Sequence, residues 1–428
     1  MMDSPKKKCG SETGARFFVS WLTFLIILSQ ILFSGCLGEK SEEEVKPADF
    51  GFFGANTAVA FATSFPERYA YSEEEREAGQ FIREEFEKMG YTVEVQEFYD
   101  DYRTKKSANY IVRIPGEGFM HREEGEIYSP LQKTVVVGAH YDISSMNIPK
   151  DDGNETQPPE ETEETEIHWV RDGIQSNASG VACLLTIADR IRVEKPAYDI
   201  ILVAFGAGTS NFRGAREFLR MMNTDEKEQI DVMYCIESIY AGDKLYASSG
   251  MSSLIPGRKY EFRRKLYEAY DVVYNHMLRS KNGVDLYYNM STIQTDLNGD
   301  DIPDIYREVT LNRSDYVPFD EIGIPIVFFE SYDYNATEIS EMKETKNLNL
   351  QEAGGMIRGT ALDSTELLSN QIEPERLELR INNTAYIIIE SIKRGAHNAL
   401  STSEYQAGVR LDPIIRVTET VPYQSMRP

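Results

Sequence analysis

Short apolar runs and amphipathic segments alternate along most of this 428-residue chain. Apolar runs rich in β-branched residues, which are typical of strands buried on both faces, lie at 134–137, 199–205, 231–237 and 323–329. Apolar positions recur with helical spacing, or fill a helix-length segment, at 72–90, 179–192, 212–222, 258–279 and 373–394. Residues 91–99 and 109–114 favour two further strands. This alternation predicts an α/β fold: a three-layer sandwich whose mixed, mostly parallel central sheet carries helices on both faces.

The first 36 residues have the pattern of an export signal. Lysines at positions 6–8 precede an apolar run at 17–33, which ends in Leu-Phe-Ser-Gly-Cys at 32–36. This ending resembles a lipobox, in which Cys36 would be lipidated and become the first residue of the mature protein. The alternative is an uncleaved membrane helix, for which 17 apolar residues are near the lower limit. Either interpretation places the rest of the chain at the cell surface, outside the cytoplasm and held at the membrane.

Changes of composition divide the remaining chain. We expect a charged linker at 37–59, one α/β domain at 60–399 and a tail without clear pattern at 400–428. Within the domain, residues 148–169 are rich in Asp, Glu and Pro, which predicts a solvated acidic insertion.

Charge and cysteine content narrow the function classes. The net charge of −25 argues against nucleic-acid binding, which needs clustered Lys and Arg. Cys183 lies in an apolar helical segment and Cys235 in an apolar strand, so both are expected to be buried as small apolar residues. A disulfide between them has no support from spacing.

Polar residues follow the apolar run 134–137 directly. His140 and Asp142 are expected at the carboxyl end of this strand, where open α/β sheets place functional residues. Four further segments stand in order around this one: the helix and strand at 72–96, Asn-Ala-Ser-Gly at 177–180, Phe-Gly-Ala with a later Gly at 205–214, and Arg-Ser-Asp with a later Gly-Ile-Pro at 313–325.

Together with Gly-Ala-His-Tyr-Asp at 138–142, these segments resemble the di-zinc aminopeptidase family. That family includes bacterial leucyl aminopeptidases, glutamate carboxypeptidase and glutaminyl cyclase. It also includes the transferrin receptor ectodomain, which serves in recognition without peptidase chemistry. The resemblance covers roughly residues 60–395, so we describe 60–399 as a zinc-exopeptidase-like domain.

The resemblance implies a role for each matched position. His140 stands at a zinc-ligand position, Asp142 at that of the carboxylate orienting it, and Glu237 at that of a ligand Asp. The other four matched positions are substituted: Ser176 stands for the bridging Asp, Gly208 for the catalytic Glu, Thr209 for a ligand Glu and Tyr316 for the last His.

These substitutions argue against a zinc centre, because neutral side chains cannot offset two dications. Two interpretations of the retained pair stay open. One is a single metal ion held by His140, Glu237 and a stand-in such as Asp172 or His168. The other is a structural hydrogen bond between His140 and Asp142, capped by Tyr316.

A second group of oxygen ligands lies at 296–304. Asp296, Asn298, Asp300 and Asp304 surround a Gly with the spacing of the first half of a calcium loop. The twelfth position is Arg307, where a Glu is wanted, and Glu308 comes one residue late. We therefore expect a calcium-loop-like insertion at 290–308, with an ordinary acidic turn as the alternative.

The function that follows best is a membrane-anchored, peptidase-like surface protein without hydrolytic activity, acting as a binding or scaffold module for a peptide or protein ligand. The first alternative is a metallo-aminopeptidase that releases N-terminal residues from peptides with displaced metal ligands. A metal-free enzyme using Ser176, Tyr316 and His140 is a third, which no nucleophile–base spacing supports.

Overall fold

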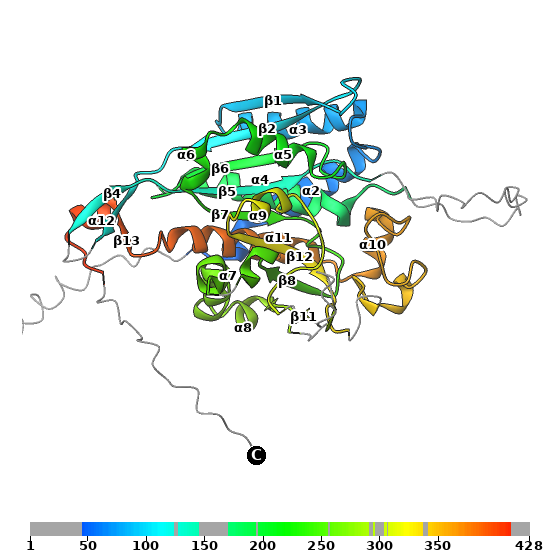
Figure 1. Cartoon of the computed structure of the whole chain (residues 1–428). Coiled ribbons are helices and arrows are strands. Elements are labelled where there is room, and N and C mark those ends of the chain that lie inside the picture. The colour runs from blue at the N-terminus through cyan, green and yellow to red at the C-terminus, as the bar shows by residue number, and fades with distance from the viewer. Residues whose placement is uncertain are drawn as a thin grey trace, which may run out of the picture. The chain divides into compact units, whose positions relative to one another are not determined.

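An eight-stranded sheet forms the centre of the fold (Figure 1). In order across the sheet its strands are β1 (Val93–Tyr99), β2 (Lys106–Ile114), β6 (Asp199–Phe205), β5 (Thr134–His140), β7 (Ile230–Ile236), β12 (Ile326–Tyr332), β8 (Lys244–Ser248) and β9 (Leu286–Tyr287). The middle strands β6, β5, β7 and β12 all run parallel, whereas β1, β2 and β8 pair antiparallel with their inner neighbours. The predicted mixed sheet is thus confirmed.

The computed structural model describes residues 45–123, 127–144, 170–193, 196–255, 257–290, 294–295, 304–305, 307–336 and 341–411. Every element described below belongs to the compact unit Pro47–Pro428.

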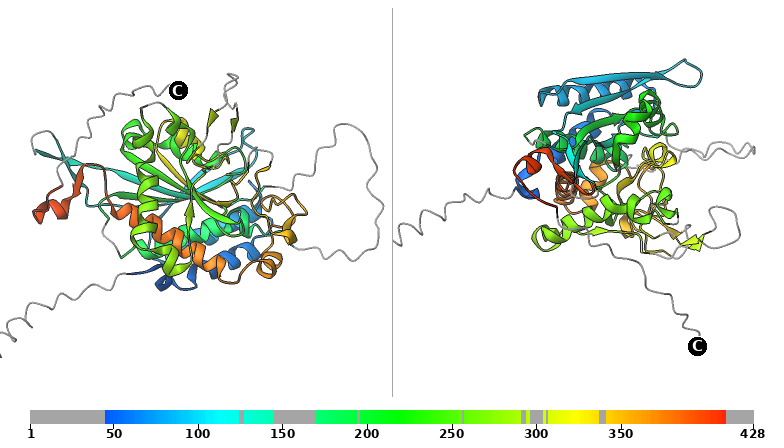
Figure 2. Two further views of the ribbon diagram at one scale, coloured as in Figure 1. Left: turned by 90° about the horizontal axis from the view of Figure 1, so that it is seen from below. Right: turned by 60° about the vertical axis from the view of Figure 1, so that its left-hand side comes forward.

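Helices cover both faces of the sheet (Figure 2). The larger core contains residues of α2 (Phe53–Ser64), α3 (Glu73–Lys88), α4 (Ser179–Ile191), α7 (Lys259–Asn275) and α11 (Arg376–Lys393). The smaller core, on the opposite face, contains residues of α5 (Arg213–Met221) and α9 (Val317–Glu321). Short helices α6 (Thr224–Gln229), α8 (Leu278–Asn282), α10 (Thr365–Gln371) and α12 (Thr402–Gln406) join these layers, with 3-10 turns at Pro47–Phe50, Met251–Leu254 and Leu348–Leu350.

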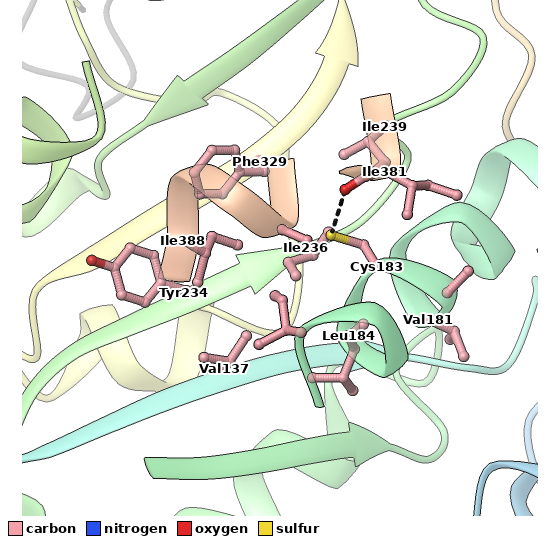
Figure 3. Packing of buried hydrophobic residues seen from close by; sticks show 14 of the residues in the cluster. Val137, Val181, Cys183, Leu184, Tyr234, Ile236, Ile239, Phe329, Ile381 and Ile388 are labelled. Atoms are coloured by element: carbon pink, nitrogen blue, oxygen red, sulfur yellow. Dashed lines mark hydrogen bonds between the residues drawn. The ribbon is translucent and has the colours of Figure 1, made fainter. Parts of the chain in front are cut away.

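The surroundings of strand β5 explain why an apolar run without alternation predicts a buried strand. Val135 and Val137 belong to the larger core, and Val136 belongs to the smaller core on the other face. Successive side chains of a strand point to opposite faces, so a strand covered on both sides needs apolar residues at every position. Figure 3 shows the larger core where α4 meets α11: the Cys183 thiol lies 3.7 Å from the carbonyl oxygen of Ile381.

Both cysteines of the described chain are free and buried, as expected for small apolar residues. Burial raises the pKa of each thiol, so neither favours the thiolate form.

The fold begins earlier and ends later than the sequence pattern predicts. Helix α2 and the turn Pro47–Phe50 occupy much of the expected linker at 37–59, and Ala58 within it is fully buried. At the other end, β13 (Ala399–Ser401) and α12 lie in the expected tail. Strand β13 completes a small sheet with β3 (Phe119–Arg122) and β4 (Tyr128–Leu131), beside the red helix α12 in Figure 2. Parts of the expected linker and tail therefore belong to the fold.

None of the helices in the described part of the chain combines the length and the apolar character that crossing a membrane requires.

Candidate functional site

Three neighbouring parallel strands, β6, β5 and β7, end at one edge of the sheet, and the candidate site lies there. His140 is the last residue of β5, Thr209 lies in the loop after β6, and Glu237 directly follows β7. A cleft of about 330 Å³ opens between these loops. It is lined by His140, Ile143, Ser144, Ser176, Thr209, Glu237, Asn312, Arg313, Met356, Arg358 and Gly359. The structure thus brings together four of the predicted site residues, as the carboxyl ends of parallel strands should.

His140 and Asp142 lie close together, and the imidazole Nδ1 faces both the backbone oxygen and the carboxylate of Asp142. The Nδ1 atom of His140 lies 2.9 Å from the backbone oxygen of Asp142 and 3.4 Å from its carboxylate Oδ1. Burial would lower the pKa of His140, yet the Asp142 and Glu237 carboxylates raise it well above its ordinary value. Burial would raise the pKa of Asp142, yet hydrogen bonds from His140 and Thr209 hold it below its ordinary value. The two residues therefore form a buried pair of opposite charges.

Most of the Asp142 carboxylate is used to hold the loop after β6. The amide of Gly208 donates to Oδ1 over 2.6 Å, and the amide and hydroxyl of Thr209 donate to Oδ2 over 3.0 and 2.5 Å. The two preceding amides are held as well, Gly206 by Asn109 Oδ1 at 3.1 Å and Ala207 by Glu75 Oε1 at 2.7 Å. Four consecutive amides thus donate to buried side chains, which fixes the loop in place.

Gly208, at the position of the family's catalytic Glu, packs directly against His140. A Cβ atom added to Gly208 would lie 2.4 Å from His140 Cβ and 2.7 Å from Cγ. Such distances are far below van der Waals contact, so the loop in its present position has no room for any side chain there.

Glu237 pairs with an arginine that the sequence did not indicate. Its Oε1 atom lies 3.1 Å from Arg358 Nη1 and 3.7 Å from His140 Nε2. Burial would raise the pKa of Glu237, but Arg358 and His140 together hold it below its ordinary value. Within the described chain, the other oxygen, Oε2, is buried without a hydrogen-bond partner.

The remaining predicted positions are engaged in structural contacts. Ser176 lies in a π-helical turn (Ile174–Ala178), and its hydroxyl donates to Asp363 Oδ2 over 2.5 Å. Asp172 accepts the amides of Ile174 and Thr365, so it faces the start of α10.

Tyr316 does not cap His140, contrary to the prediction. Its hydroxyl donates to the backbone oxygen of Asn312 over 2.6 Å, and its ring packs on Phe328. The tyrosine belongs to the smaller core and is 4% exposed.

Asp315, next to Tyr316, is a titratable group that sequence reasoning missed. It is 1% exposed, and neither carboxylate oxygen has a hydrogen-bond partner among the described residues. Burial raises its pKa to about 7, although His140 opposes the shift.

Comparison with known proteins identifies the family. Residues 122–354, more than half of the chain, match the sequence pattern of Peptidase family M28. The chain belongs to this family. The resemblance to the di-zinc aminopeptidases is thereby confirmed, and Arg358 lies four residues beyond the matched segment.

Two kinds of relative accompany this match. The alkaline phosphatase isozyme conversion protein of Escherichia coli (strain K12) is 24% identical over 355 residues, which cover 81% of this chain and 90% of that protein. Glutaminyl cyclase from an Acidobacteriales bacterium has a similar structure, with a TM-score of 0.52 and 16% identity over 84% of this chain and all of that one. BSAP, a zinc aminopeptidase from Bacillus subtilis, has a TM-score of 0.49 and 13% identity over 81% of this chain and 97% of its own. The cyclase likeness shows the α/β fold of M28 proteins.

Within the described part of the chain, the positions matched to the family do not supply the ligand set of a di-zinc centre. Among the described residues, no three or more His, Cys, Asp or Glu side chains are placed to hold a metal ion. Of the family's zinc-ligand positions, only those of His140 and Glu237 keep side chains that bind zinc, and Glu237 already pairs with Arg358. A catalytic zinc ion usually takes three protein ligands.

Several predicted residues lie outside the described part of the chain. These are Cys36, His168, Asp296, Asn298 and Asp300, together with the acidic insertion at 148–169. The backbone at position 304 belongs to β11 (Asp304–Ile305), which pairs with β10 (Gln294–Thr295); the side chain of Asp304 is not described. Glu308 pairs with Arg263 and lies 3.2 Å from Lys259 Nζ, so two cations of α7 hold it.

Proposed function

We propose that this M28 protein is a peptide-binding or protein-binding module that works without zinc and does not hydrolyse its ligand. The observation that carries the proposal is the pairing of Glu237 with Arg358 at 3.1 Å, at the position where the family has a ligand Asp. A carboxylate bonded to a guanidinium is poorly placed to bind a dication as well. Gly208 cannot move a proton, and loss of the general base alone costs on the order of 10²- to 10⁴-fold in rate.

A ligand in the cleft would meet groups suited to a peptide. The Glu237 carboxylate lines the cleft, and its negative charge suits an ammonium group. Thr209 and Asn312 add polar groups to the lining, and Ile143 and Met356 add apolar surface. Pockets of this size with mixed lining are typical of small-ligand or peptide-end recognition.

Zinc content and hydrolysis test the proposal directly. The purified full-length protein should contain far less than one equivalent of zinc and should cleave no aminoacyl p-nitroanilide. Zinc at one or more equivalents, with activity abolished by a chelator and by His140→Ala, would overturn it. That result would establish the metallo-aminopeptidase with displaced ligands.

We also propose that the protein stays at the membrane through a lipid on Cys36. The support is the order of the first 36 residues, in which lysines, an apolar run and the lipobox-like ending follow one another. Cys36→Ser should leave the precursor unprocessed or release the protein from the membrane fraction. A variant that is processed and retained like the wild type would refute the lipid anchor and favour the uncleaved helix.

A further inference from the structure

One guanidinium meets three buried carboxylates beside the cleft. Arg358 Nη1 lies 3.1 Å from Glu237 Oε1, and its Nε lies 3.1 Å from Glu344 Oε1. Its Nη2 lies 3.7 Å from Glu330 Oε2. The side chains of Glu330 and Glu344 are fully buried, and that of Glu237 is 11% exposed. We call these four residues the Arg358 cluster.

The carboxylates of the Arg358 cluster come from three separate segments. Glu237 follows β7, Glu330 lies within β12, and Glu344 lies in the loop that follows β12. Three carboxylates brought together away from water repel one another and are strongly destabilised unless a positive charge is present. Zinc ions supply that charge to the acidic residues of a di-zinc site. In this chain the Arg358 guanidinium brings positive charge to the three carboxylates, one of which, Glu237, stands at a family ligand position.

Arg358 is held in place before any ligand arrives. Its own backbone amide donates to Glu344 Oε2 over 2.7 Å, so one carboxylate binds both the backbone and the side chain of the arginine. Glu344 is fixed in turn by Gln175 Nε2 at 2.8 Å and the amide of Ile357 at 2.5 Å. Burial would lower the pKa of Arg358, but the carboxylates raise it, so the charge is permanent.

We propose that Arg358 supplies, from the chain itself, the positive charge that metal ions bring to this site in zinc-dependent members of the family. The proposal rests on the zinc-free function proposed above and adds the residue that makes it stable. It predicts that the site depends on Arg358 as a metalloprotein depends on its metal.

Thermal unfolding of the full-length protein tests this dependence, with EDTA in one arm and Zn²⁺ alone in the other. The wild-type Tm should be the same in both arms. Arg358→Ala should lower the Tm in EDTA by about 5 °C, because removing one partner of a buried pair leaves uncompensated charge. Zn²⁺ at 100 times its Kd should raise the Tm of this variant by about 3 °C, since His140 and the carboxylates of the Arg358 cluster are then free to bind it.

Matched variants show whether zinc stabilises the protein by binding at this site and whether the site needs a guanidinium rather than any positive charge. Zn²⁺ should not stabilise Arg358→Ala combined with His140→Ala, which lacks the imidazole ligand. Arg358→Lys should fall between wild type and alanine, because an ammonium cannot face three carboxylates with a planar fork. If Arg358→Ala does not fold, Arg358→Ala in a Glu237→Gln background, which carries one charge fewer, should fold.

The outcomes are distinct. A wild-type Tm for Arg358→Ala overturns the inference, and so does a lowered Tm that zinc does not raise, because the arginine is then an ordinary ion pair. Failure of both Arg358→Ala and its Glu237→Gln combination to fold overturns it as well, since removing a carboxylate should then have helped. Zinc bound by the wild type would instead refute the proposed function.

Discussion

Adding a single methyl group to Gly208 should destabilise this protein through one contact, that with His140. The backbone φ of Gly208 is not in the left-handed region, so alanine would otherwise be allowed and even favoured by about 0.4–1 kcal/mol through the unfolded state. The added Cβ, however, would lie 2.4 Å from His140 Cβ, 2.7 Å from Cγ and 3.1 Å from Nδ1.

The surroundings leave little room for relief. His140 Cβ is attached to the backbone of β5, whose two neighbours in the sheet hold it on both sides, so no rotamer change moves it. The loop on the other side is tied by the amides of residues 206–209. Overpacking a well-packed core typically costs about 1–3 kcal/mol. We therefore expect Gly208→Ala to lower the free energy of unfolding by about 1–3 kcal/mol, and Gly208→Glu to lower it further.

Urea denaturation of a double-mutant cycle measures the effect and its source. His140→Gly removes the atom that the new methyl group would strike, so Gly208→Ala should cost at least about 1 kcal/mol less in that background than in the wild type. A Gly208→Ala variant as stable as the wild type would refute the reasoning, and so would a coupling energy near zero. Either result would mean that the loop moves freely and that position 208 can still accommodate a catalytic Glu.

Three other predictions follow from the same structure. Burial raises the pKa of Glu75 to about 8, so the native state keeps a proton that the unfolded state loses; stability is full below about pH 4 and falls as the pH rises to 8. Between pH 5 and 8.5 the wild type should lose on the order of 3–5 kcal/mol of unfolding free energy through this group, and Glu75→Gln should not. Urea midpoints at the two pH values measure this, and the same change with pH in both proteins would contradict it. Arg68 is fully buried, and its guanidinium donates hydrogen bonds to five oxygen atoms. Arg68→Met should therefore lower the free energy of unfolding, measured by urea denaturation, by at least about 3 kcal/mol. A loss below about 1 kcal/mol would contradict this prediction. Millimolar calcium should raise the Tm through the loop at 296–304, and less so in Asp300→Asn; no shift in the wild type would remove the calcium site.

The sequence predicted the fold well because its strongest signals are local. The parallel strands β5, β6 and β7 are apolar at nearly every position, and the predicted bounds of β6 and β7 differ from the observed ones by at most one residue. The sequence did not predict helix α2, because a helix is recognised from a local periodic signal and this segment has none. Its sequence is mostly Ala, Thr, Phe and Gly, with apolar residues on all sides, so no periodicity marked it.

The candidate site was only partly visible in the sequence. His140, Asp142 and Glu237 could be placed because each lies at or just beyond the carboxyl end of a predicted strand. Arg358 and Asp315 could not be given their roles, because those depend on which buried groups the folded chain brings beside them. Only the burial of Asp315 and the three carboxylates around Arg358 distinguish these residues from ordinary surface charges. The close contact between the loop backbone at Gly208 and His140 also arises only in the folded chain, so a side-chain motif in the sequence cannot show it.

The contacts of His140 and Asp142 account for their presence without any catalysis. Asp142 accepts three hydrogen bonds from Gly208 and Thr209, so its removal would leave buried donors unpaired in a loop that packs on the sheet edge. His140 lies between the carboxylates of Asp142 and Glu237 and offsets part of their charge. Arg358 offsets the rest. A metal-site motif thus has two physical parts, the donors that bind the ion and the charges that must be balanced once they are buried. At the family's positions the described residues include few of the donors, yet the buried charges still have to be balanced, which is why the His-x-Asp pair alone is weak evidence for zinc.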